Sequence, residues 1–99
     1  MHTTRVFIIQ PMDWRSTEEI LQERNRLINL LTQEGYDIAN PDLDTSDKTP
    51  FQKLISGLEV MYGCDKIAVI KWANDSKGCR VEIEFAGMLE LEEERYENF

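Results

Sequence analysis

The stretch "KIAVIKWANDSKGCRVEIEFAG", residues 66–87, contains a complete strand–loop–helix unit and decides the class of fold. Residues 66–72 are dominated by apolar and β-branched side chains, which predicts a short buried strand. A polar, Gly-containing loop follows, and from about Gly78 the apolar residues recur at helical spacing. A buried strand that leads directly into a helix is typical of a parallel sheet covered by helices.

Two further strands are expected upstream, each ended by a proline. Residues 5–9, "RVFII", form a short apolar run that closes before Pro11, and residues 36–40, "YDIAN", form another that closes before Pro41. Proline cannot continue a central ladder, so both runs must end there. Each run is followed by a polar loop and then by a helical pattern.

The helices between these strands carry their own start and stop signals. Ser16 with Glu19 predicts a capping box at the start of the first helix, and Gly35 ends it. In the second helix Thr49 is the expected N-cap, Pro50 occupies the first turn, and Gly63 is the stop. The expected buried stripes are Ile20, Leu21, Leu27, Ile28 and Leu31 in the first helix, and Phe51, Leu54, Ile55, Leu58 and Met61 in the second.

The order β-α-β-α-β-α predicts one α/β domain spanning residues 1–99, a small three-layer sandwich of the flavodoxin/Rossmann-like kind. The expected parallel sheet has the strand order 2-1-3 and helices on both faces. The last helix is expected to run into the acidic tail, residues 90–99, and to fray there. This leaves one sheet edge unpaired, which favours a homo-oligomer, either a homodimer or a larger assembly.

Composition excludes several classes of function. The chain carries 19 Asp and Glu against 11 Lys and Arg, so polymeric nucleic acid is not an expected partner. One histidine, His2, and two cysteines without ligand spacing predict no metal site, and no cofactor is expected. No apolar run is long enough for a signal peptide or a membrane span. A cytoplasmic protein with a small-molecule ligand is the expectation.

Glu82 is the candidate that the helical pattern places nearest the rim, although Glu90 and Glu93 also fall in or near the apolar arc later in the helix. With Cys79 taken as the origin and 100° per residue, Glu82 falls between Leu89 and Ala86 inside the apolar arc. It is expected near the rim where the carboxyl ends of the strands meet, which is where ligands bind in such sheets. The nearby helix N-terminus would keep it ionised. The alternative interpretation is a first-turn Glu that satisfies backbone N–H groups.

Four segments in order resemble the nucleoside 2-deoxyribosyltransferase-like superfamily, most closely its small members of unassigned function. They are "VFIIQPM", "LTQEGYDIANP", "CDKIAVIKW" and "SKGCRVEIEFA", and the last resembles the family signature S-x-G-x-x-x-E-x-x-x-A. The resemblance implies that Glu82 is the catalytic nucleophile. It implies an N-glycosidase or 2-deoxyribosyltransferase that acts on a deoxynucleoside or its 5′-monophosphate.

The resemblance also implies a set of substrate-binding residues. Ser76 matches a serine that binds the 5′-phosphate, and with Gly78 it opens a helix N-terminus, a natural anion site. An ordinary N-cap is the alternative for Ser76, and a solvated turn is the alternative for Trp14 and Arg15. The complete expected set is Gln10, Pro11, Met12, Asp13, Trp14, Arg15, Asn40, Ser76 and Gly78.

Two departures from the family pattern favour a second hypothesis. Gln10 replaces the glycine that usually precedes Pro11 and could obstruct the pocket, and Gly57 stands where the glycosidases carry an Asp that assists proton transfer. Asp42, Asp44 and Asp75 are possible substitutes for that Asp. The alternative function is therefore a catalytically weakened nucleotide-binding module, or a protein-interaction module of the same fold.

Overall fold

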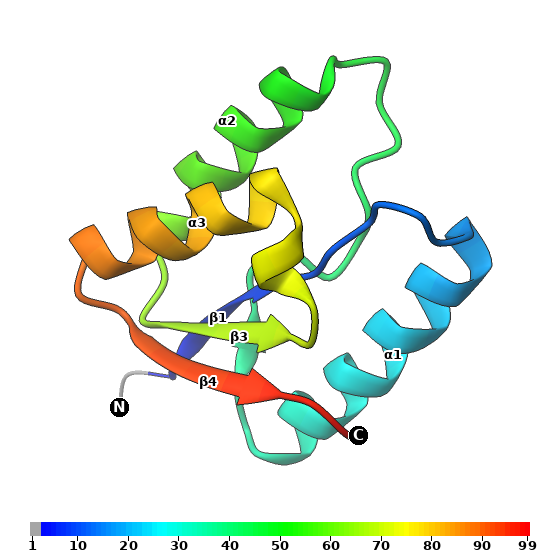
Figure 1. Ribbon diagram of the computed structural model, residues 1–99. Helices are drawn as coiled ribbons and strands as arrows, with labels where there is room; N and C mark the ends of the chain where they lie inside the picture. The colour runs from blue at the N-terminus through cyan, green and yellow to red at the C-terminus, as the bar shows by residue number, and fades with distance from the viewer. Residues whose placement is uncertain (1–2) are drawn as a thin grey trace.

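The computed structural model describes residues 3–99, so the expectation about His2 lies outside the described residues. A four-stranded parallel sheet has the order β2-β1-β3-β4 and is covered by helices on both faces (Figure 1). None of the helices within residues 3–99 is long and apolar enough to cross a membrane. The elements are β1 (Arg5–Ile9), α1 (Thr17–Gln33), β2 (Asp37–Ile38), α2 (Pro50–Met61), β3 (Lys66–Ile70), the short 3-10 helix η1 (Ala73–Asp75), α3 (Lys77–Met88) and β4 (Glu92–Tyr96).

Alternation along β1 builds the two apolar layers of the sandwich. Val6 and Ile8 face α1, where they pack with Leu27 and Leu31. Phe7 and Ile9 face the opposite side, where their cluster contains residues of α2 and α3. Because successive side chains of a strand point to opposite faces, a strand that is apolar throughout must be covered on both sides. The three-layer α/β sandwich predicted from the sequence is therefore confirmed.

The helix boundaries follow the predicted caps closely. The Ser16 side chain accepts from the Glu19 N–H, and α2 carries a complete capping box between Thr49 and Gln52 with Pro50 in the first turn. Gly35 has φ +86°, a left-handed conformation that glycine adopts without strain. These ends are set by local hydrogen bonds, which explains why the sequence alone located them.

The acidic tail is a strand, which corrects the prediction of a frayed helix. Helix α3 ends at Met88, Glu90 turns the chain with φ +58°, and β4 then runs parallel to β3 from Glu92 to Tyr96. The predicted strand order 2-1-3 is correct for the first three strands, and β4 extends it to 2-1-3-4. The edge of β3 is therefore paired. The argument for a homo-oligomer from an unpaired β3 edge is lost with this finding.

Lys66 explains how an acidic segment docks as a strand. Its side chain is 3% exposed and pairs with Glu94, and its Nζ lies 3.8 Å from Glu92. Further along β4, Tyr96 is buried in the α1-side cluster and its ring meets Phe99 edge to face. One buried cation and one buried ring compensate for the weak strand propensity of the glutamates.

The predicted buried side of α2 is only partly correct. Met61 is fully buried and Leu58 packs against the core, but Phe51 is 69% and Ile55 42% exposed. The helix contacts the core mainly through its C-terminal half, near β3. Its N-terminal half stands away from the sheet beside the cleft described below, so the apolar residues there remain accessible.

Candidate functional site

A cleft of about 780 Å³ opens at the carboxyl ends of β1 and β2, between α2 and the first turns of α3. This volume lies within the range that is usual for small-ligand sites. The predicted site residues that line it are Gln10, Met12, Asp13, Trp14, Asn40, Ser76, Gly78 and Glu82. The fold therefore brings together residues from three loops and one helix that are up to 72 positions apart, counting from Gln10 to Glu82.

Two members of the predicted set lie elsewhere. Pro11 is fully buried and does not line the cleft. Arg15 turns toward α1, where its Nη1 donates to Glu23 Oε1 at 2.6 Å and to the Pro11 carbonyl at 3.2 Å. Arg15 lines a second, smaller hollow on the α1 side of the sheet. In this structure neither residue is positioned to contact a ligand in the larger cleft.

Glu82 lies in the second turn of α3, six residues after the cap position Ser76. It is too far along the helix to satisfy the free N–H groups of the first turn. Across the cleft floor, Glu82 Oε2 would be only 3.3 Å from a Cβ built on Gly57 of α2. The first-turn interpretation is therefore wrong, and Glu82 faces α2 at the base of the cleft.

Burial controls the charge of Glu82. Desolvation raises the pKa of its carboxyl to about 7, and the nearby positive charge of Arg24 opposes that rise. The expectation that the helix N-terminus would hold Glu82 ionised is not met, because the dipole effect fades beyond the first turn. At neutral pH the carboxyl is poised between its two protonation states, a property typical of functional sites.

Ser76 occupies the N-cap position of α3, but its side chain makes no capping hydrogen bond. Its hydroxyl instead interacts with the Cys79 thiol, and the residue is 7% exposed at the cleft wall. The ordinary N-cap interpretation therefore describes its backbone position only. The cleft wall here consists of a helix N-terminus and a serine whose hydroxyl is not used as a cap.

Gln10 is part of the wall and does not fill the cleft. Its Nε2 donates to the Ile20 carbonyl at 2.9 Å and to Glu23 Oε1 at 3.0 Å, while its Oε1 accepts from Arg24 at 2.8 Å. These bonds fix the side chain against α1 and leave it 5% exposed. In this rotamer the Gln10 side chain therefore does not obstruct the cleft, although the replacement of the family's glycine suggested that it could.

Arg24 is a site residue that the sequence reasoning missed. It is 3% exposed, lines the cleft, donates to Gln10 and to the Asn40 carbonyl, and its Nε has no partner within residues 3–99. A signal was available, since Arg24 follows Ile20 by four positions and precedes Leu27 by three. A cation on the apolar stripe of α1 is the counterpart of the carboxylate on the apolar arc of α3.

The fold and the cleft define a class of protein: a small parallel α/β sandwich with a half-buried carboxyl and a buried guanidinium at the ligand-binding edge of its sheet. The structure is similar to that of a CMP N-glycosidase, BcmB, from Clostridium botulinum. The TM-score is 0.63 at 20% identity, and the match covers 93% of this chain and 67% of that chain. This likeness establishes a shared fold.

The sequence comparisons add nothing to the structural one. No family model matches the chain, and no curated protein matches it.

Proposed function

We propose that the protein is an N-glycosidase or 2-deoxyribosyltransferase that acts on a deoxynucleoside or deoxynucleoside 5′-monophosphate. The observation that carries the proposal is the Glu82 carboxyl, half-buried at the base of a cleft of about 780 Å³, with its pKa raised to about 7 by desolvation. Cleavage of a glycosidic bond passes through an oxocarbenium-like state, which a carboxylate stabilises or traps. The shared fold with a CMP N-glycosidase is consistent with this chemistry.

In the proposed reaction the ionised Glu82 attacks the anomeric carbon while the bond to the base breaks. The electron pair of that bond leaves with the base, which takes up a proton. Water then cleaves the glycosyl ester, releasing the sugar and restoring the carboxylate. If a second base attacks in place of water, the result is transfer. Arg24 acts as a positioning residue, because its charge favours the ionised form of Glu82.

The proton for the departing base needs a donor other than Gly57. Asp13, Asp42, Asp44 and Asp75 all line the cleft and are the available acids. Gly57 itself brings α2 close to Glu82, because even a single methyl group at this position would lie only 3.3 Å from Glu82 Oε2. We assign the donor role to this group of aspartates, to be separated by substitution of each with Asn.

The remaining cleft residues are proposed to hold the substrate. Ser76 and Gly78 open the N-terminus of α3, where free backbone N–H groups attract a phosphate. Trp14 is 65% exposed and offers a ring for stacking on a base. Five carboxylates and three cations line the cleft, so its charge does not by itself demand a phosphorylated substrate. Nucleosides therefore belong in the assay beside nucleotides.

The alternative proposal is a nucleotide-binding module with little catalysis. The observation that favours it is Gly57, which leaves the side of the cleft next to Glu82 without a second carboxyl. A binding module would show ligand affinity that survives Glu82→Gln and no release of base.

The deciding experiment measures base release. Wild type and Glu82→Gln are incubated with 2′-deoxynucleosides, their 5′-monophosphates and CMP, with and without a second free base, and the products are separated by chromatography. Base release that is lost in Glu82→Gln supports the enzyme. Binding detected by calorimetry, without release of base from any substrate, would select the binding module. If the protein neither binds nor cleaves any of these compounds, both proposals are refuted.

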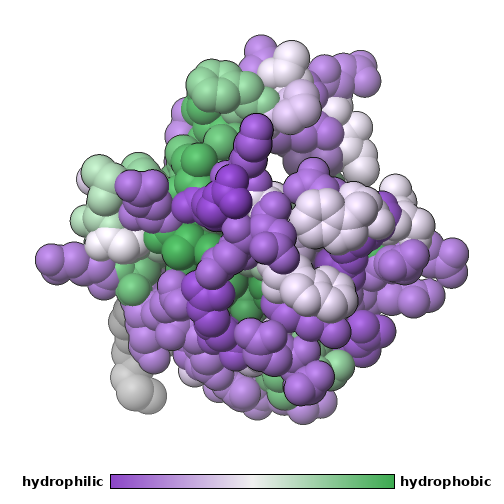
Figure 2. All heavy atoms as spheres, in the orientation of Figure 1, coloured by the Kyte–Doolittle hydropathy of each residue, from purple (hydrophilic) through white to green (hydrophobic). Residues whose placement is uncertain are grey.

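We also propose a homo-oligomer, on a basis different from the sheet edge. Figure 2 shows hydrophobic surface over α2 and α3. Phe51 of α2 and Val81 and Met88 of α3 are 69%, 42% and 76% exposed. Exposed apolar side chains on two neighbouring helices are candidates for an association surface. Sedimentation velocity should detect a dimer that dissociates in the double variant Phe51→Ser, Met88→Ser. A wild-type monomer at all concentrations would contradict this.

A further inference from the structure

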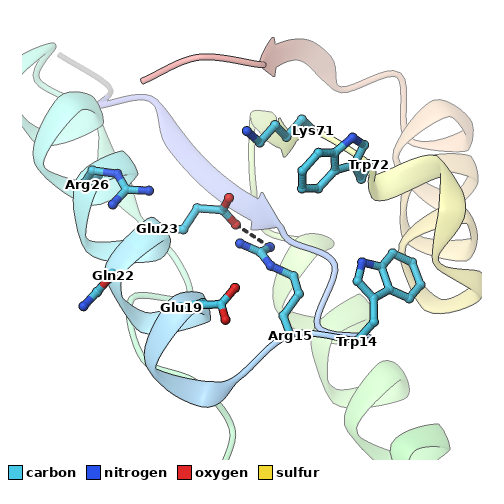
Figure 3. A pocket seen from close by; sticks show the side chains of 8 residues that line it. All are labelled: Trp14, Arg15, Glu19, Gln22, Glu23, Arg26, Lys71 and Trp72. Carbon is cyan, nitrogen blue, oxygen red and sulfur yellow. Dashed lines mark hydrogen bonds and ion pairs between the residues drawn. The ribbon is translucent and has the colours of Figure 1, made fainter.

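The two tryptophans of the chain lie near each other at the rim on the α1 side of the sheet. Trp14 follows β1 and Trp72 follows β3, and both line a hollow of about 330 Å³ (Figure 3). Their indole rings form one wall, and the polar side chains of α1 lie opposite. The lining is completed by Arg15, Glu19, Gln22, Glu23, Arg26 and Lys71.

Neither the backbone nor the core accounts for tryptophan at these two positions. Trp14 has φ +53° and Trp72 φ +68°, left-handed conformations that bulky residues rarely adopt and that glycine adopts freely. The side chains are 65% and 55% exposed, so they add little to the buried core. Strained residues of this kind concentrate at ligand clamps. The rings themselves are therefore the feature that needs a function.

This hollow is separate from the cleft that contains Glu82. Of the residues that line the two cavities, only Trp14 is common to both. Between them stands a hydrogen-bonded partition, in which Glu23 Oε1 accepts from Arg15 and from Gln10. Trp72 lines the hollow and does not line the cleft. A substitution at Trp72 therefore tests the hollow without altering the wall of the cleft.

The chemistry of the walls selects the ligand. Two ring faces favour a planar π system, and base–aromatic stacking is a strong, sequence-tolerant contact. On the opposite wall, α1 contributes the carboxylate of Glu19, an acceptor, and the guanidinium of Arg26, a donor. A cationic ligand is disfavoured, since three cations line the hollow against two carboxylates, and Lys71 already lies 4.7 Å from the centroid of the Trp72 ring.

We propose that the Trp14–Trp72 hollow is a second binding site, for a planar heteroaromatic ring with a polar edge, of the nucleobase type. The ring stacks on the two indoles and its edge meets α1. This site goes beyond the proposed glycosidase cleft and shares only Trp14 with it.

The two tryptophans also supply the probe. In Trp14→Phe, Trp72 is the only tryptophan of the chain, and its emission reports on the hollow. Titration with adenine or cytosine should give saturable quenching, whereas 2-deoxyribose should give none. The same titration in Trp14→Phe, Glu82→Gln should give the same dissociation constant. If the protein releases no base from any substrate, quenching of the Trp72 emission is still expected. The two proposals can therefore be refuted independently.

Trp72→Gly removes the ring without straining the chain, because its left-handed backbone suits glycine. Calorimetry with the same bases should show binding weakened about tenfold or more at the hollow, as expected for loss of a stacking partner. Base release from the cleft should be unchanged. An unaltered affinity in Trp72→Gly, or an absence of saturable quenching in Trp14→Phe, would overturn the proposal. So would Trp72 emission that changes with protein concentration alone, which would assign the hollow to a second copy of the chain.

Discussion

Arg24 Nη1 donates a 2.8 Å hydrogen bond to Oε1 of Gln10, and both side chains are buried at the wall of the cleft. Through Gln10 the contact continues to Glu23 and on to Arg15, which lines the smaller hollow. A chain of charged and amide groups thus separates the two cavities and holds the guanidinium within electrostatic reach of Glu82. Such a network is stable only while each member has its partner.

Gln10→Gly should therefore destabilise the protein. Removal of the side chain leaves Arg24 Nη1 without this acceptor and Glu23 Oε1 without one donor, at a cost of about 2–3 kcal/mol in the free energy of unfolding. Urea unfolding measures the difference, with Gln10→Met as a variant that keeps the volume and loses the bonds. Wild-type stability in Gln10→Gly together with faster base release would instead mean that Gln10 obstructs the cleft.

Glu82→Gln should stabilise the protein at high pH and not at low pH. The folded-state pKa of Glu82, about 7, is raised above the unfolded value, so the stability linked to its protonated form is complete below about pH 4.5 and is lost as the pH rises through 7. The neutral amide escapes this loss, and the variant should gain about 3 kcal/mol over wild type at pH 8.

Urea unfolding at pH 4 and pH 8 tests this expectation. Glu84→Gln, an exposed carboxylate on the same helix, controls for the loss of one negative charge. If Glu82→Gln is less stable than wild type at pH 8, the ionised Glu82 carboxylate must be stabilised by interactions other than its attraction to Arg24.

Arg24→Met should raise the pKa of Glu82 above 7, because Arg24 is the charge that opposes its desolvation. The titration can be followed by carbon NMR of the Glu82 carboxyl. If ionised Glu82 is the nucleophile, base release should rise with pH, and the midpoint of that rise should move upward in the variant. Arg24→Lys keeps a positive charge and should shift the midpoint less. An unchanged midpoint in Arg24→Met would exclude the electrostatic coupling.

Gly57→Ala should alter Glu82 more than it alters the fold. The new methyl lies 3.3 Å from Glu82 Oε2, which displaces water and should raise the pKa of the carboxyl further. Alanine also favours the helix by about 1 kcal/mol, which offsets the crowding. Gly87→Ala is the matched control, since a Cβ there meets nothing within 4 Å. Equal NMR titrations of Glu82 in both variants would contradict the contact.

A chain that ends at Glu90 should lose cooperative unfolding. The truncation removes β4, leaves the buried ammonium of Lys66 without Glu94, and strips Tyr96 from the α1-side core. Loss of one fully buried aromatic side chain from a core costs about 1.5–3 kcal/mol, to which the lost pairing of β3 adds. Thermal unfolding followed by circular dichroism checks this, with a chain that ends at Glu97 as the control. A truncated protein as stable as wild type would restore the frayed-tail interpretation.

Much of the fold and part of the site could be predicted from the sequence. The first three strands, the caps of α1 and α2 and the position of Glu82 near the rim depend on local patterns of polarity, proline and glycine. β4 could not be predicted, because its glutamates disfavour a strand until Lys66 of another strand compensates them. The sequence predicted too many buried residues in α2. The spacing of apolar residues indicates a helix but does not indicate whether the sheet extends beneath the whole of it.

The sequence by itself determined the α/β class, the helix ends and the Ser76–Glu82 spacing, because these follow from bonds and periods within a few residues. Only the tertiary structure decided that Gln10 turns to α1, that Arg24 lies beside the cleft, and that the pKa of Glu82 is raised. Desolvation and pairing of charges depend on every group that surrounds a side chain. Those groups come from segments far apart in the chain, and their distances exist only after folding.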